Sequence, residues 1–432
     1  MIRVDRRRFL QFAMLSAAGL SSVAMAGCGS DSASGELALR YGGWGDNIRQ
    51  RNYTEALKQF SQAHPDILVQ PEFAEYNAFQ ERMTTQIAAR EVPDIFWIAS
   101  PQVLTYHKSK LYRKLDDIPT LDLSAYAPQE VESFKIGGEL NTMPFGVFVP
   151  VVRYNETFAD QDGVTIPTEG PGWTWDALAQ LLLDYSKNNA AKRKGLPYTP
   201  HGDLPFEAWL RQRGEQLWTE DGRLGWTVDG LASWLDWWEK LRQGGATLSI
   251  SEQEGMDPDW ELVGDKVLLN FGNSNHIIDE ATMFPDYTFR LRPAPTAPGA
   301  ASGHKFLYFP RMAIYRGIDD EKVEAAGRMI NYNTNDIAML RTVGMTMGAP
   351  VNPKIAQEVL PNANPNEKEM LAVVQSDRAV ERKPRYEAPP GSSTWRTAMS
   401  RVCEGIALGR TNVTDGAKTL IDEINAGIER AQ

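Results

Sequence analysis

Aromatic side chains are the residues of this sequence whose type and placement best suit a binding chemistry. The 432-residue chain has 12 Trp, 14 Tyr and 16 Phe. A flat aromatic face can stack on the apolar C–H face of a sugar ring, while Asp, Glu, Asn and Arg side chains bond the sugar hydroxyls. Several tryptophans stand at predicted strand ends or loop junctions: Trp44, Trp97, Trp173, Trp209, Trp260 and Trp395.

A tryptophan can also be an ordinary core residue. We prefer that interpretation for four that lie in or at the start of predicted amphipathic helices: Trp175, Trp234, Trp237 and Trp238. For Trp44 and Trp395 both interpretations stay open.

Carboxylates offer a different chemistry. Asp257, Asp259 and Glu261 cluster near Trp260, and a glycosidase needs two carboxylates a few ångströms apart in a sugar-sized cleft. Such a cluster on one short loop is more typical of a solvated turn. The sequence has no Gly-x-Ser-x-Gly elbow, no Gly-Lys-Ser/Thr phosphate loop and no histidine pair at metal-binding spacing. We therefore expect a protein that is not an enzyme and has no cofactor or metal, with a secreted glycosidase as the alternative.

The N-terminal stretch is predicted to be an export signal. Three arginines at 6–8 precede a 15-residue apolar run at 12–26, and Cys28 then follows small residues. This order resembles a bacterial twin-arginine signal that ends in a lipoprotein cleavage box. We expect residues 1–27 to be a signal peptide, Cys28 to carry a lipid and residues 28–35 to be a flexible tether. The protein would then be exported and held at the outer face of the cytoplasmic membrane, or be periplasmic.

Composition narrows the class of protein and of partner. The net charge is -11, and a surface that acidic argues against nucleic acid and anionic lipid as partners. Contact with a membrane is expected only through the lipid. A lipid on Cys28 would leave Cys403 unpaired, and we expect Cys403 to be a small core residue. A chain of this length suggests two or three domains.

The first part of the mature chain alternates strands and helices. Strands are predicted at 36–41, 67–73 and 94–99, with helices at 46–63 and 77–90, and Asp46 is placed to cap the first helix. The strand at 94–99 is apolar without alternation, which is typical of a parallel sheet covered on both faces. This order predicts an open, doubly wound sheet.

The apolar run at 137–155 is predicted to be a buried strand through which the chain leaves one lobe for another. A second series of helices follows, with two further apolar strands at 265–273 and 304–316. We therefore predict an α/β fold with two doubly wound lobes that are interleaved along the sequence and joined by strand crossovers.

Short motifs along the mature chain resemble the extracellular solute-binding proteins of family 1, which deliver carbohydrates to ABC importers and include maltose-binding protein. Each motif is degenerate, but their order and spacing are specific. They are FSQAHP at 60–65, VPDIFW at 92–97, MPFG at 143–146, RYN at 153–155, TWDAL at 174–178 and the stretch 264–273.

The resemblance implies a periplasmic-binding-protein-like fold of class II, a monomer with its ligand in the cleft between two lobes, and an ABC permease as partner. The implied N-terminal lobe comprises residues 36–147 and 274–314, and the C-terminal lobe residues 148–273 and 315–432. Crossovers are expected near 146–152, 271–274 and 314–317.

The resemblance also implies ligand contacts at matching positions. In the first lobe and first crossover these are Trp44, Asp46, Asn47, Glu75, Tyr76, Trp97, Ser100, Phe145 and Phe148. In the far lobe they are Asp203, Phe206, Trp209, Asn273, Ser274, Trp395 and Arg396. Ser100 and Phe148 stand where maltose-binding protein has acids, so maltose itself is not expected. A glycerol phosphate ester is the alternative ligand within the family, with Arg311 and Arg396 as the residues that would bind the phosphate.

Overall fold

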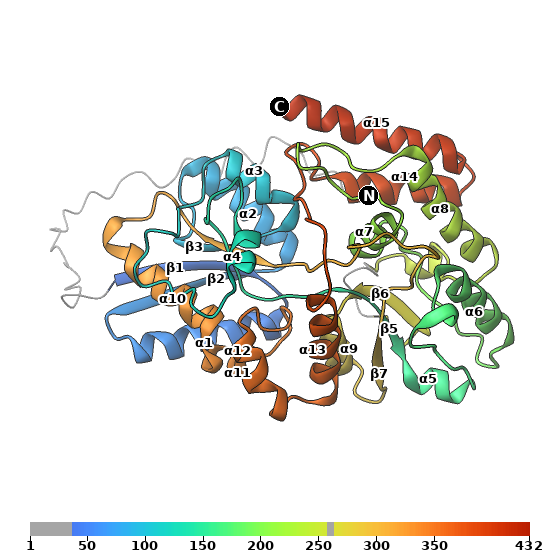
Figure 1. Cartoon of the computed structure of the whole chain (residues 1–432), viewed down its shortest axis with the longest axis horizontal. Coiled ribbons are helices and arrows are strands. Elements are labelled where there is room, and N and C mark those ends of the chain that lie inside the picture. The colour runs from blue at the N-terminus through green and yellow to red at the C-terminus, as the bar shows by residue number, and fades with distance from the viewer. Residues whose placement is uncertain (1–36, 257–262) are drawn as a thin grey trace, which may run out of the picture. The chain divides into compact units, whose positions relative to one another are not determined.

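A computed structural model describes residues 37–256 and 263–432 (Figure 1). Its first sheet has five strands in the order β2-β1-β3-β8-β4. β1 pairs in parallel with β2 and β3, whereas β8 is antiparallel to β3 and β4. The strands span Leu37–Trp44 (β1), Ile67–Ala74 (β2), Ile95–Ile98 (β3), Met143–Pro144 (β4) and Arg311–Ile314 (β8).

Helices on both faces bury this sheet. α1 (Asn47–Ala63) begins where the Asp46 carboxylate accepts a hydrogen bond from the Arg49 N–H at 2.8 Å, which is the predicted cap. Tyr53, Leu57 and Phe60 of α1 share one core with β1 and β3. α2 (Tyr76–Ala89) packs on the other face with α3 (Val103–Lys108). The βαβαβ order predicted for this part of the chain is confirmed.

The second sheet has three strands in the order β6-β5-β7. They span Pro150–Asn155 (β5), Leu269–Asn273 (β6) and Phe289–Pro293 (β7), and β5 is antiparallel to both neighbours. The predicted α/β fold with two sheets is confirmed. The three strands of the second sheet are antiparallel, and isolated parallel bridges join Lys194 to Val267, just before β6, and Leu196 to Thr247.

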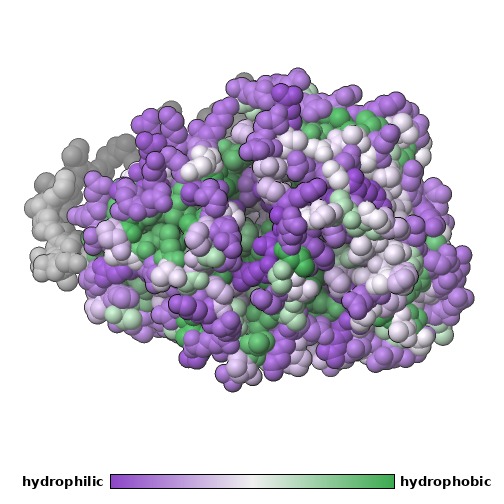
Figure 2. All heavy atoms as spheres, in the orientation of Figure 1, coloured by the Kyte–Doolittle hydropathy of each residue, from purple (hydrophilic) through white to green (hydrophobic). Residues whose placement is uncertain are grey.

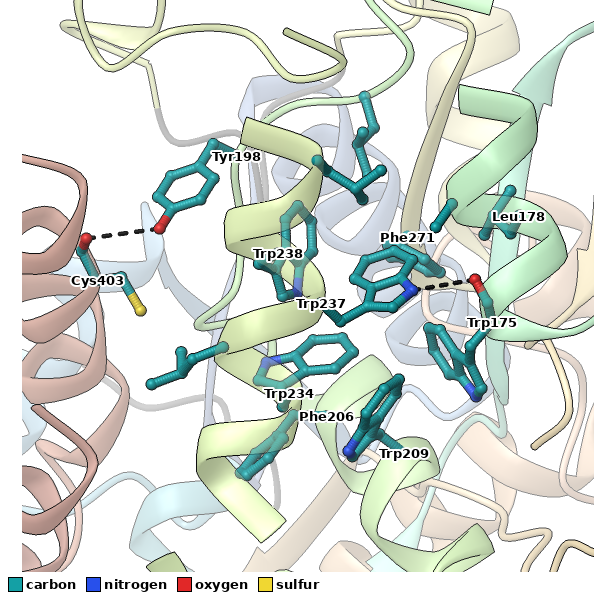
Figure 3. Packing of buried hydrophobic residues seen from close by; sticks show 14 of the residues in the cluster. Trp175, Leu178, Tyr198, Phe206, Trp209, Trp234, Trp237, Trp238, Phe271 and Cys403 are labelled. Carbon is teal, nitrogen blue, oxygen red and sulfur yellow. Dashed lines mark hydrogen bonds between the residues drawn. The ribbon is translucent and has the colours of Figure 1, made fainter. Parts of the chain in front are cut away.

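A tryptophan-rich core covers this sheet (Figure 3). Trp175, Trp234, Trp237 and Trp238 are at most 5% exposed, so their interpretation as core residues is confirmed. The indole N–H groups of Trp234 and Trp237 donate there to the Pro200 and Trp175 carbonyls at 2.7 and 3.0 Å. The surrounding helices are α5 (Glu156–Gln161), α6 (Trp175–Asn188), α7 (Asp203–Gln212), α8 (Val228–Gln243), α14 (Trp395–Ala407) and α15 (Val413–Ala431). Cys403 is buried in the same core, as expected.

The observed sheets divide the chain differently from the expected lobe boundaries. Residues 274–314 are expected with the first lobe, yet β7 lies within them and pairs with β5. Residues 315–432 are expected with the second, yet α10 (Val323–Asn335) and α11 (Ile337–Val343) pack with β1 and α1. Short connections explain both differences, because consecutive elements tend to stay on the sheet they follow. The chain passes between sheets after β4, as expected, but returns between β7 and β8 and not at 271–274.

The remaining helices are α4 (Pro128–Phe134), α9 (His276–Met283), α12 (Pro353–Val359) and α13 (Pro365–Arg378). Among the described residues, no helix combines the length and apolar character needed to cross a bilayer. Hydrophilic residues predominate on the face drawn in Figure 2. The predicted signal peptide, the Cys28 lipidation site and the tether, like Asp257, Asp259, Trp260 and Glu261, lie outside the described residues.

Candidate ligand-binding site

An aromatic cluster forms at the carboxyl ends of β1 and β3. Trp44 ends β1 and lies edge-on to Tyr76 and Trp97, with ring centroids 5.5 and 5.3 Å apart. Trp97 is fully buried and stacks on Phe145 at 4.7 Å. Tyr76, in contrast, is 39% exposed and Trp44 is half-buried. Trp97 therefore supports the cluster from below, and Trp44, Tyr76 and Phe145 are its partly exposed members.

Local packing fixes this cluster. The Trp97 indole N–H donates to the Tyr41 hydroxyl at 2.8 Å, which fixes the ring orientation. A Cβ at Gly43 would lie 2.6 Å from the Phe73 ring and 2.8 Å from the Trp97 ring. Glycine at position 43 is therefore what lets these rings approach the strand.

Polar side chains lie at the same edge of the first sheet. Asp46 and Asn47 are exposed at the start of α1, and Glu75 is exposed immediately before α2. Ligands of open α/β sheets bind beyond the carboxyl ends of the strands. These three side chains are therefore at the edge where the sequence predicts binding.

Residues from the second sheet and its helices approach Tyr76. Asp203 at the start of α7, Asn273 at the end of β6 and Arg396 of α14 line one small pocket together with His276. Desolvation raises the pKa of Tyr76; nearby Arg396 opposes this shift and nearby Asp203 adds to it. The structure thus brings Tyr76 close to two residues that lie more than 120 positions away in the chain.

The small pocket is closely packed. Its volume is about 20 Å³, roughly the space of one water molecule. The Asn273 amide contacts His276 Nε2 at 3.5 Å, and His276 Nδ1 lies 3.2 Å from Arg153. This pocket by itself is therefore too small to hold a sugar ring.

A second group of contacts centres on Tyr308, which the sequence did not single out. Phe148 stacks on the Tyr308 ring at 4.8 Å, and the Arg385 guanidinium lies 4.6 Å from the ring centroid. Burial raises the pKa of Tyr308, and a side-chain hydrogen bond with Ser100 opposes that shift. Phe148 and Tyr308 are also paired by a β-bridge. Tyr308 lies inside the strand predicted at 304–316. Its aromatic type near an expected strand crossover is the feature of the sequence that could have identified it as a site residue.

Three expected contact residues lie in the hydrophobic core instead. Phe206, Trp209 and Trp395 are 0, 4 and 4% exposed and belong to the tryptophan-rich core. The Trp395 ring packs edge-on against Trp218, and the Arg213 guanidinium covers the Trp209 ring at 3.4 Å. The Trp209 ring also packs edge-on against Trp175 and Trp234. The core interpretation of Trp395 is therefore the one that the structure favours.

Ser274 and Arg311 are buried and already engaged. The Ser274 hydroxyl accepts from the Val149 N–H at 3.2 Å, which ties β6 to the first crossover. The Arg311 guanidinium donates to the Phe134 and Ser133 carbonyls and to the Thr142 hydroxyl at 3.1–3.3 Å. Arg396 lies at the small pocket and reaches the His201 carbonyl. No group of three or more metal-ligating side chains occurs within residues 37–256 and 263–432.

Comparison with known proteins defines the class. The bacterial extracellular solute-binding protein family matches residues 55–369. This chain therefore belongs to that family, and the resemblance inferred from its motifs is confirmed.

Solved structures of solute-binding proteins share the fold. An oligogalacturonide-binding protein from Yersinia enterocolitica is 18% identical, with a TM-score of 0.79 over 92% of this chain and 100% of that one. Lmo0181 from Listeria monocytogenes, solved with cycloalternan, is 18% identical, with a TM-score of 0.72 over 91% and 99%. The GacH receptor of Streptomyces glaucescens, solved with acarbose, is 16% identical, with a TM-score of 0.72 over 91% and 99%.

Proposed function

We propose that this solute-binding protein holds a sugar or oligosaccharide between its two sheets and delivers it to the permease of an ABC importer. The observation that carries the proposal is the partly exposed aromatic pair Trp44 and Tyr76, in which Tyr76 lies close to Asp203 and Arg396 of the helices that flank the second sheet. Aromatic faces and hydrogen-bonding side chains are what a sugar ring requires. The three solved structures named above are of proteins described with oligosaccharide or pseudo-oligosaccharide ligands.

Ligand binding on this proposal works by closure. Trp44, Asp46, Asn47, Glu75, Tyr76 and Ser100 form the side of the first sheet. Asp203, Asn273 and Arg396 form the side of the second sheet, and Phe148 and Tyr308 lie in the segments that cross between the sheets. A ligand that touches both sides stabilises the closed arrangement, because those contacts exist only when the sides approach. Phe145 and Trp97 support the aromatic side, and Phe206, Trp209, Ser274 and Trp395 support the other side from within.

The proposal also covers the location and the oligomeric state of the protein. We expect export by the N-terminal signal, a lipid on Cys28, a monomeric body at the outer face of the membrane and a role in binding without catalysis. The two lobes would be the five-stranded and the three-stranded sheets with their helices.

A screen of ligands tests the function. The mature chain is titrated by calorimetry with mono-, di- and trisaccharides, and each saccharide is recovered afterwards and analysed. Tight binding of a saccharide that is returned uncut supports the proposal. Cleavage of the saccharide would favour the glycosidase alternative, and binding of none would overturn the carbohydrate specificity.

A further inference from the structure

Four charged side chains form a continuous chain of ion pairs that connects the two sheets. Glu207 of α7 lies 3.0 Å from Arg385, Arg385 lies 3.4 Å from Glu387, and Glu387 lies 3.4 Å from Arg311 of β8. Arg385 and Glu387 belong to the segment 379–394, which connects α13 to α14. This series of ion pairs therefore starts on α7, which flanks the second sheet, and ends on β8 of the first sheet.

These four groups are withdrawn from water. Their side chains are 2% (Glu207), 15% (Arg385), 14% (Glu387) and 7% (Arg311) exposed. Burying a charge is costly unless it is paired. Each guanidinium is therefore held to its carboxylates, and the two positive and two negative charges cancel.

The ion-pair chain lies directly beside the candidate site. The Arg385 guanidinium lies over the Tyr308 ring. The Tyr308 hydroxyl is hydrogen-bonded with the Ser100 side chain, and the Tyr308 ring stacks on Phe148. Asp203, which lines the small pocket, and Glu387 both lie close enough to Tyr308 to raise the pKa of its phenol. A ligand at Tyr308 therefore meets paired cations and at least one further carboxylate.

An anionic ligand needs a cation that is not already neutralised. Arg311 and Arg385 are bound to Glu207 and Glu387, and these carboxylates would repel a uronate or phosphate placed between them. Arg396 shares its pocket with Asp203. Breaking one ion pair would leave a buried carboxylate without its partner, which is costly.

We infer that this site selects neutral saccharides over uronic acids and sugar or glycerol phosphates, through the ion-pair chain Glu207–Arg385–Glu387–Arg311. The inference rests on the proposed function and specifies its ligand class. It also argues against Arg311 as a residue that binds a phosphate ester, because its guanidinium is held by Glu387, Thr142 and two backbone carbonyls.

The test compares neutral ligands with their anionic counterparts. Calorimetry on the mature wild-type chain at pH 7.5 uses galactobiose against digalacturonic acid, glucose against glucuronic acid, and glycerol against glycerol 3-phosphate, with a panel of neutral trisaccharides. We expect the best ligand to be neutral and to bind at least tenfold more tightly than any anionic probe. This comparison needs no variant and so does not depend on whether a variant folds.

Variants then test the cause. Glu387→Gln removes one carboxylate from Arg385 and Arg311, and we expect it to shift the ratio of anionic to neutral affinity towards the anion by at least tenfold. Glu369→Gln is the control, because it removes an ion pair to Arg290 on α13 and β7, where both side chains are about 30% exposed. Its ratio should equal that of the wild type.

The outcomes separate the two proposals. A wild type that prefers digalacturonic acid or glycerol 3-phosphate overturns the inference while a binding function stands. A folded Glu387→Gln chain with an unchanged ratio also overturns it. If no saccharide binds, neutral or acidic, the proposed function fails and the inference fails with it.

Discussion

Arg49 of α1 and Asp279 of α9 form an ion pair of 3.4 Å between helices that flank different sheets. The side chains are 18 and 25% exposed, and Arg49 Nε also reaches the Thr346 hydroxyl at 3.4 Å. Burial raises the pKa of Asp279 to about 6. Arg49 and Arg153 oppose the shift, whereas Asp46 and Glu280 add to it. Desolvation of the carboxylate therefore outweighs its attraction to Arg49.

Asp279 should make stability depend on pH. Its folded-state pKa is raised from 3.8 to about 6, so the protonated carboxyl favours the folded state. That contribution is fully present below about pH 4 and is lost as the pH rises through about 6. At about 1.4 kcal/mol per pKa unit, the free energy of unfolding falls by up to ~3 kcal/mol across this range.

Asp279→Asn isolates this effect. Asn cannot titrate, so the difference in unfolding free energy between variant and wild type should grow in favour of the variant from pH 4 to pH 7. Urea denaturation at each pH measures it, and the remaining carboxylates cancel in the difference. A difference that is flat with pH, or that grows in favour of the wild type, would contradict the raised pKa.

Tyr76→Ala should weaken ligand binding with little effect on stability. The Tyr76 ring is 39% exposed and contacts Trp44 only edge-on, so its removal leaves no closed cavity. Loss of one stacking face should cost about 1 kcal/mol or more of binding free energy, which is roughly fivefold or more in Kd. Calorimetry with the best saccharide of the screen measures the change.

Leu360→Ala is the matched control for Tyr76→Ala, because Leu360 is comparably exposed at 45% but is not part of the proposed site. Both variants should melt near the wild-type temperature. Equal affinities for Tyr76→Ala and the control would remove Tyr76 from the binding surface.

Trp395→Ala should act through stability. Trp395 is 4% exposed and its ring packs against Phe206 and Trp218. Truncating a buried tryptophan costs about 3–5 kcal/mol, since the loss of burial is joined by a cavity. Thermal unfolding of the ligand-free chain measures the loss. An unchanged melting temperature together with lost binding would instead place Trp395 in the ligand site.

The order of elements was predictable because it depends on local pattern. The strand at 94–99 and the capped helix from Asp46 follow from an apolar run and a capping side chain. The sheet to which each element belongs was not predictable from the sequence. The positions of β7 and α10 depend on pairing and packing with residues that are far away in the sequence. For the site, Tyr76 lies close to Asp203 and Arg396, which line one pocket with Asn273, and their role as ligand contacts stays a prediction. Arg385 and Glu387 could not be found, since only the fold carries their segment to Tyr308.

Glu280→Gln should be strongly destabilising and should also disturb the pocket. Glu280 accepts from Arg153 Nε at 2.8 Å, and both side chains are at most 2% exposed. Removing the negative charge leaves a buried guanidinium without its counter-ion, which typically costs about 3–5 kcal/mol. Arg153 also contacts His276, which lines the pocket with Asn273, so a displacement of Arg153 should lower ligand affinity as well.

Chemical denaturation measures the stability, and Glu156→Gln is the control, because the ion pair of Glu156 with Arg290 is about 30% exposed on both sides. An exposed pair is worth at most about 1 kcal/mol, so equal losses in the two variants would show that burial of the Arg153–Glu280 pair does not govern its importance.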